Sequence, residues 1–156
     1  MISTPVTCVV DASVAVKLVV AETDSPQAHA LFAHLSGDPS ARFYVPDLFY
    51  VECANILWKK VKRGDFREPE ALAKLATLVS LPLELRSSKD LVENALRLAV
   101  GCDATAYDSL YVTTADHLAL PLITADDKLV KKFAGGSCQI YLLKNLAIPA
   151  VPTPPP

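Results

Sequence analysis

Several residue types are scarce in this 156-residue chain, and each scarcity excludes a class of protein. Only five residues are glycine while just over half of the chain is apolar, which suits one well-packed domain and leaves too little sequence for two. The four cysteines stand singly, with no CxxC pair, no zinc-type spacing and no secretory signal ahead of them. We therefore expect reduced core thiols in a cytoplasmic protein.

Charge of one sign and long apolar runs are also missing. The 15 basic residues face 17 acidic ones, for a net charge of −2, so no global basic field can hold nucleic acid by phosphate neutralisation. The basic run Lys59–Arg63 is the best local positive feature, and we interpret it mainly as a cationic helix end, which the macrodipole favours. No apolar run is long enough to cross a bilayer, so no membrane association is expected.

The apolar pattern predicts alternating strands and helices. Short apolar runs predict strands at 7–10, 43–45, 121–124 and 139–143, with a weak edge strand at 81–85. Helical spacing and capping residues predict helices near 13–19, 26–36, 48–63, 69–79, 89–98, 104–115 and 127–133, with Asp47, Ser87 or Ser88, Asp103 and Asp126 as caps. We predict an α/β fold of three layers, with a central parallel β-sheet between helices. Ligand sites of such sheets lie at the carboxyl ends of the strands.

One domain over residues 1–145 accounts for these elements. The remaining segment, 146–156, is rich in proline and ends in three of them, so it cannot build a core. We expect it to be a disordered tail.

Four acidic residues are difficult to explain as solvated surface groups. Asp11 and Asp126 follow predicted buried strands directly, although each could cap the helix after it. Glu52 shares an apolar helical stripe with residues four positions away on either side, and Asp108 lies in a similar stripe. A carboxylate in such a stripe costs several kcal/mol unless something pairs with it. No lysine or arginine is spaced to neutralise Glu52 or Asp108 within its own helix.

A hard divalent cation would neutralise these acids. Mg²⁺, or alternatively Mn²⁺, takes oxygen ligands, commonly a few carboxylates together with waters and substrate phosphates. The pattern of strand-end and helix-embedded carboxylates therefore suggests a metal site.

The segments around the four acids resemble the acidic motifs of PIN domains, particularly those of the VapC-type toxins of bacterial toxin–antitoxin pairs. The four segments are Val9–Ser13, Tyr50–Leu57, Ala106–Tyr111 and Leu122–Asp126. Each is weak alone, but four in this order are specific and span nearly the whole chain outside the tail. The resemblance implies a pocket of Asp11, Glu52, Asp108 and Asp126, with Ser13, Asn55 and Thr124 as supporting polar groups. It also implies an RNA substrate, a homodimer and a cognate antitoxin.

On this basis we expect a Mg²⁺-dependent endoribonuclease that cleaves RNA phosphodiester bonds. Asp11, Asp108 and Asp126 form the expected metal set, while Glu52 with Asp108 orients the attacking water. Asn55, one turn after Glu52, is expected to hold that carboxylate. The number of metal ions is left open. The three histidines match none of the motifs and no G-x-S-x-G turn is present, which argues against histidine-based and serine-hydrolase chemistry.

Two alternatives remain at this point. One is a PIN-like RNA-processing nuclease that works without an antitoxin. The other is a non-catalytic module of the same fold that uses its acidic cleft to bind a basic peptide.

Overall fold

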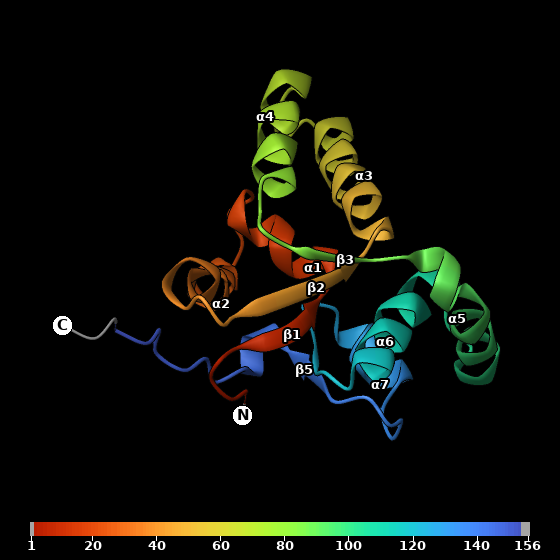
Figure 1. Cartoon of the computed structure of the whole chain (residues 1–156). Helices are drawn as coiled ribbons and strands as arrows, with labels where there is room; N and C mark the ends of the chain where they lie inside the picture. Colours follow the sequence, from red (N-terminus) through yellow and green to blue (C-terminus); the bar gives the residue numbers. More distant parts are fainter. Residues whose placement is uncertain (1, 154–156) are drawn as a thin grey trace.

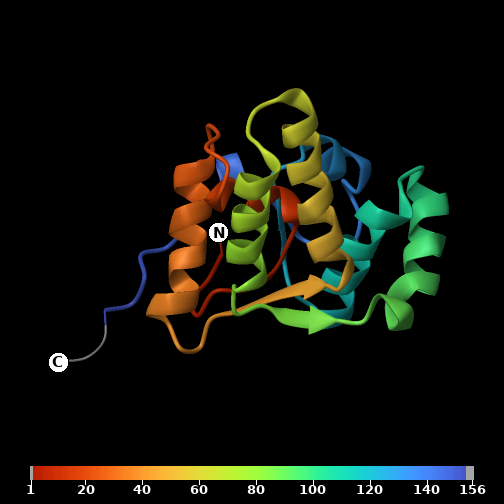
Figure 2. The same ribbon diagram turned by 90° about the horizontal axis from the view of Figure 1, so that it is seen from above.

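Five parallel strands form one sheet in the computed structural model, which describes residues 2–153. The spatial order is β3-β2-β1-β4-β5, with bounds β1 (Thr7–Val10), β2 (Arg42–Pro46), β3 (Glu84–Arg86), β4 (Leu122–Thr124) and β5 (Ile140–Leu142). Helices flank the sheet on both faces (Figures 1 and 2). The predicted three-layer α/β fold is confirmed, and each of the five expected strands is present.

The helices follow the predicted pattern, with the first one shorter than expected. Their bounds are α1 (Ala12–Ala15), η1 (Val16–Leu18), α2 (Ser25–Gly37), α3 (Leu48–Arg63), α4 (Glu68–Val79), α5 (Ser88–Cys102), α6 (Ala106–Leu118), α7 (Asp127–Lys132) and η2 (Leu143–Asn145). Helices α3 and α4 stand side by side above the β3 edge of the sheet in Figure 1, and α5 packs along α6. Gly64 ends α3 with a φ of 82°, a left-handed conformation that glycine adopts without strain.

Strand β1 lies at the centre of the sheet, between β2 and β4. Its residues are almost fully buried because both faces are covered, and Val10 pairs with Ile123 of β4. This pairing places the carboxyl ends of β1 and β4 next to each other. The residues that follow them, from Asp11 and from Thr124 onward, therefore emerge side by side at one edge of the sheet.

Two of the expected caps act elsewhere. Asp47 makes no capping hydrogen bond to α3; its carboxylate instead accepts hydrogen bonds from the backbone N–H and hydroxyl of Ser88, at the start of α5. Asp103 is the C-cap of α5, with a φ of 49°, and Thr105 caps α6. The prediction for Asp47 failed because an acid can cap a helix distant in the sequence instead of the one that follows it. The prediction for Asp103 failed because Thr105 has the extended backbone that an N-cap needs, whereas Asp103 is left-handed.

The C-terminal tail has no regular secondary structure up to residue 153, as its prolines predict, but it is not detached from the domain. The carbonyl of Pro149 lies 2.9 Å from Nε2 of His34, a fully buried residue of α2. Val151 packs so closely on Gly37 that a Cβ there would lie 2.2 Å from its Cγ1. Pro149 and Val151 thus lie against α2, because an extended chain can pack on a helix without building a core of its own. Disorder of the segment 146–156 stays a prediction. Residues 154–156 lie outside the described part.

Within residues 2–153, no helix has the length and apolar character needed to span a membrane.

Candidate active site

Asp11 occupies the end of the central strand and is almost buried, at 8% exposure. Its Oδ1 accepts a hydrogen bond from the backbone N–H of Ser13 at 3.1 Å, which makes it the N-cap of α1. Its Oδ2 accepts a hydrogen bond from the Thr124 hydroxyl at 2.6 Å. Burial raises the pKa of Asp11, the hydrogen bonds from Thr124 and Ser13 oppose this rise, and the charge of Asp108 adds to it. The capping alternative is thus correct for one oxygen and does not account for the other.

Thr124 connects the two strand ends. Besides donating to Asp11, its hydroxyl oxygen accepts a hydrogen bond from the Asp126 backbone N–H at 3.0 Å. The Ser13 hydroxyl lies 3.5 Å from that of Thr124 and accepts a hydrogen bond from the backbone N–H of Ala125 at 3.0 Å. Both side chains therefore fix the loop between β4 and α7 against the loop between β1 and α1.

Glu52 projects from α3 toward the same region. The hydroxyl of Tyr111, in α6, donates a hydrogen bond to its Oε2. Desolvation raises the pKa of Glu52 to about 7; the Tyr111 hydrogen bond lowers it, and the charges of Asp11 and Asp108 raise it further. A carboxyl group that changes charge near neutral pH is typical of active sites.

Asp108 lies in the first turn of α6, where the Thr105 side chain accepts a hydrogen bond from its backbone N–H at 3.1 Å. Its charge raises the pKa of both Asp11 and Glu52. The fold therefore brings Asp11, Glu52 and Asp108 into one electrostatic cluster, although they come from three separate segments. We call these three residues the acid cluster.

Asp126 and Asn55 are less closely tied to this cluster than expected. Asp126 caps α7, with its Oδ1 accepting a hydrogen bond from the Lys128 backbone N–H at 2.8 Å, and its backbone reaches Asp11 through Thr124. Asn55 is exposed, and within residues 2–153 it makes no hydrogen bond with Glu52. The expected role of Asn55 belongs to Tyr111, because the Asn55 side chain faces solvent.

Tyr111 is the site residue that sequence reasoning missed. The sequence analysis placed it in the predicted helix 104–115 and at the end of the motif segment Ala106–Tyr111 but gave it no role, yet it follows Asp108 by three residues and so lies on the same helical face. A tyrosine hydroxyl on a buried face needs a partner. This combination could have indicated that Tyr111 meets an acid.

The oxygen chemistry of the site fits a hard divalent cation. Over residues 2–153, no lysine or arginine forms an ion pair with Asp11, Glu52, Asp108 or Asp126, so their charge is uncompensated by the protein. The same residues contain no group of three histidine, cysteine or acidic side chains already arranged as a metal centre. Mg²⁺ commonly keeps several waters and binds proteins through only one or two carboxylates, which suits an open cluster.

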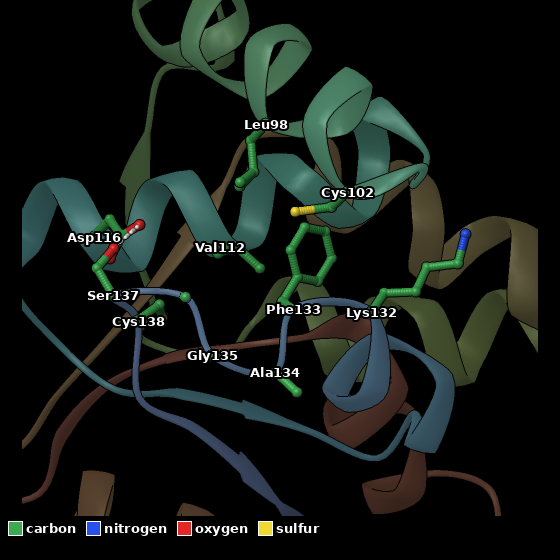
Figure 3. Close-up of a pocket in the computed structure, with 11 residues that line it drawn as sticks. Leu98, Cys102, Val112, Asp116, Lys132, Phe133, Ala134, Gly135, Ser137 and Cys138 are labelled. Atoms are coloured by element: carbon green, nitrogen blue, oxygen red, sulfur yellow. Dashed lines mark hydrogen bonds between the residues drawn. The ribbon is translucent and has the colours of Figure 1, made fainter.

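A separate, mostly apolar pocket lies between α5, α6 and the loop after α7 (Figure 3). Cys102 and Cys138 line it and are only half-buried, in contrast to Cys8 and Cys53; the expectation of core thiols therefore holds for only two of the four. Burial raises the pKa of Cys138 to about 11, so it remains a thiol. Asp116 in this pocket accepts a hydrogen bond from the Ser137 hydroxyl at 3.0 Å, and none of the four predicted acids lines it.

Comparisons with known sequences find one family model and several similar proteins. The family profile described as PIN domain matches residues 8–135. Ribonuclease VapC3 of Pyrobaculum aerophilum is 35% identical over 127 residues, covering 80% of this chain and 93% of the relative. Ribonuclease VapC12 of Mycobacterium tuberculosis is 30% identical over 135 residues, covering 86% of this chain and 98% of the relative.

Solved structures agree on the fold. PAE2754 of Pyrobaculum aerophilum superposes with a TM-score of 0.66 at 25% identity, over 88% of this chain and 85% of that one. A toxin–antitoxin complex from Klebsiella pneumoniae gives a TM-score of 0.55 at 19% identity, over 87% and 97%. The Mycobacterium tuberculosis toxin VapC20, which cleaves the sarcin–ricin loop, gives 0.60 at 16% identity, over 80% and 93%.

Proposed function

Because this chain belongs to the PIN-domain family and is a relative of the VapC ribonucleases, we propose that it is a metal-dependent endoribonuclease, the toxin of a toxin–antitoxin pair. The observation that carries the proposal is the acid cluster. It lies at the carboxyl ends of parallel strands, where α/β folds bind ligands. The pKa values of Asp11 and Glu52 are raised, and among residues 2–153 no lysine or arginine forms an ion pair with the cluster.

Asp11 and Asp108 are the residues that we propose to hold Mg²⁺ or Mn²⁺, with Asp126 joining them from the start of α7. The bound ion would supply an activated water near neutral pH and a counter-charge for the phosphate oxygens. Thr124 and Ser13 hold Asp11 and the Asp126 backbone in place, as hydrogen-bonding partners of metal ligands commonly do.

Glu52 is the proton acceptor in this proposal. Its Oε2 is engaged by Tyr111, and its Oε1 receives no hydrogen bond from residues 2–153. A carboxyl with a pKa of about 7 is half ionised near neutral pH, so Oε1 can take a proton from a water positioned beside it.

Cleavage of RNA by purified protein tests the activity. We expect cleavage of a structured RNA with Mg²⁺ or Mn²⁺ and none with EDTA. Asp11→Asn and Glu52→Gln should each lower the rate at least about 100-fold, as loss of a catalytic acid or base does. Glu84→Gln, on the exposed edge strand, is the matched acidic control and should cleave normally.

The result also separates the alternatives. Cleavage that persists in Asp11→Asn would contradict the site assignment. Absence of cleavage by the wild-type protein with either ion would favour the non-catalytic binding module.

The antitoxin partner is proposed from the same kinship and from one surface. An apolar groove between α3 and α4 is lined by Leu57, Trp58, Leu72 and neighbouring residues, and both Trp58 and Leu72 are more than half exposed. We infer that an apolar segment of the antitoxin covers this groove.

Expression of the chain should arrest growth, and co-expression of an adjacent gene should relieve the arrest. Leu72→Glu should stay toxic but escape neutralisation. Toxicity that no neighbouring gene relieves would favour an RNA-processing nuclease without an antitoxin.

The homodimer is likewise a proposal. Val92, Leu96 and Val100 repeat every four residues along α5 and are each more than half exposed, which is unusual for apolar side chains of one helix. Sedimentation should give a dimer for the wild type and a monomer for Leu96→Glu. A wild-type monomer at micromolar concentration would overturn the proposal.

A further inference from the structure

The contact between Tyr111 and Glu52 joins two helices that lie far apart in the sequence. The hydroxyl of Tyr111, on α6, donates to Oε2 of Glu52, on α3. Across residues 2–153 it is the one hydrogen bond that the protein provides to the Glu52 carboxylate. Elsewhere in the acid cluster, the Asp11 carboxylate accepts hydrogen bonds from Ser13 and Thr124, and the Asp108 backbone N–H donates one to Thr105.

The tyrosine ring is held firmly enough to act as a fixed donor. Tyr111 is 1% exposed and belongs to the main hydrophobic core, so its ring cannot turn without disturbing close-packed neighbours. Asp108 lies three residues earlier on the same helix. A shift of α6 relative to α3 would therefore move Asp108 and the donor of Glu52 together.

A glutamate side chain has three rotatable bonds, so an unheld carboxylate would sample several orientations at this half-exposed position. The hydroxyl removes most of that freedom and occupies one oxygen, which leaves Oε1 as the oxygen available to an ion or a water.

We propose that Tyr111 is a positioning residue of the active site, whose hydroxyl fixes the Glu52 carboxylate relative to Asp108 for metal binding and cleavage. The inference rests on the proposed function, because it assigns Tyr111 a task at that same site. Tyr111 touches neither RNA nor metal in this scheme and acts only through Glu52.

The test compares Tyr111→Phe, which removes the hydroxyl and keeps the ring, with Tyr107→Phe, which makes the same change on the exposed side of α6. In this scheme Glu52 would contact the ion through its bound water, so Tyr111 would be an outer hydrogen-bonding partner of the metal site. Calorimetric titration with Mn²⁺ should therefore give an affinity about 10-fold weaker for Tyr111→Phe, the lower end of the range for loss of such a partner. Tyr107→Phe should bind like the wild type. Circular dichroism checks that each variant is folded. In RNA cleavage, Tyr111→Phe should lower kcat about 10-fold and change KM less than twofold.

A double-mutant cycle with Glu52→Ala decides whether Tyr111 acts through Glu52. If it does, adding Tyr111→Phe to Glu52→Ala should change Mn²⁺ affinity less than twofold. If Tyr111→Phe weakens Mn²⁺ binding by the same factor in the Glu52→Ala protein as in the wild type, the two residues act independently and the inference is overturned. A folded Tyr111→Phe protein that binds Mn²⁺ like the wild type would overturn it as well. Wild-type protein that binds Mn²⁺ but cleaves no RNA would instead count against the proposed function, and the binding cycle would still decide the role of Tyr111. Wild-type protein that binds no Mn²⁺ would overturn both.

Discussion

At the scale of single residues, Glu52 makes the stability of the metal-free protein depend on pH. Its pKa is raised from 4.5 to about 7, so between these values the folded protein binds a proton more tightly than the unfolded chain does. Stability is therefore greatest at low pH and is lost as pH rises through about 7; the raised pKa of Asp11 acts in the same direction. Because Glu52 is partly exposed, we expect a loss on the order of 1 kcal/mol between pH 5 and pH 8.

Urea unfolding in EDTA at several pH values measures this loss. The Glu52→Gln variant has no charge to titrate and should show a clearly smaller pH dependence. An unchanged dependence in that variant would contradict the assignment to Glu52.

Thr124 gives a second prediction at this scale. Thr124→Val keeps the shape of the side chain but leaves Oδ2 of Asp11 and the backbone N–H of Asp126 without their partner. We expect a loss of about 1–3 kcal/mol in the free energy of unfolding and about 10- to 100-fold in RNA cleavage.

Thr114→Val is the matched control, since Thr114 is equally buried but bonds only to a carbonyl of its own helix, that of Leu110. It should retain normal cleavage. Equal loss of activity in the two variants would mean that the effect is one of folding rather than of the site.

Individual site residues were predictable to different degrees. Asp11 and Asp126 follow strands, and a parallel sheet brings its strand ends together whatever the details of packing. The partner of Glu52 was not predictable in the same way, because Tyr111 lies 59 residues away and only the packing of α3 and α6 on the sheet, where both contact β2, brings the two together. Periodicity identifies a buried face but does not name the side chain opposite it.

At the scale of elements, the start of α5 depends on a residue of another segment. The Asp47 carboxylate, between β2 and α3, accepts hydrogen bonds from Ser88 across 41 positions of sequence. Asp47→Ala should lower the free energy of unfolding by about 1 kcal/mol, as loss of an N-cap does, and should increase amide exchange in the first turn of α5. Asp47→Asn should recover most of the stability. Exchange that rises at α3 instead would restore the sequence-based assignment of this cap.

The existence and order of the elements were predicted well, for a physical reason. Buried strands such as β1 and β4 are short apolar runs, and helices such as α2 and α3 carry local stop signals at Gly37 and Gly64. These signals act within a few residues of the chain. Asp47 and Asp103 were assigned wrongly as the caps of α3 and α6, because the backbone N–H groups at a helix start donate to whichever side-chain oxygen the fold places there, including one from a distant loop.

At the scale of the whole molecule, the docked tail makes Gly37 sensitive to substitution. A Cβ at Gly37 would lie 2.2 Å from Cγ1 of Val151, so Gly37→Ala should displace the tail and lower the free energy of unfolding by about 1 kcal/mol. In a chain that ends at residue 147, the same substitution should be neutral or stabilising, because alanine is the better helix former. Thermal unfolding measures both effects when the wild type and Gly37→Ala are compared in the full chain and in the shortened chain. Equal destabilisation with and without the tail would contradict the contact.

The central position of β1 also bears on how the protein is made. Thr124, which holds the Asp11 carboxylate, follows it by 113 positions. The ribosome therefore adds β4 long after β1, and the sheet edge of the site exists only once β4 is present. A nascent chain therefore has no assembled pocket until nearly all of the domain has left the ribosome. A copy that is still being synthesised therefore lacks the assembled site that RNA cleavage would need.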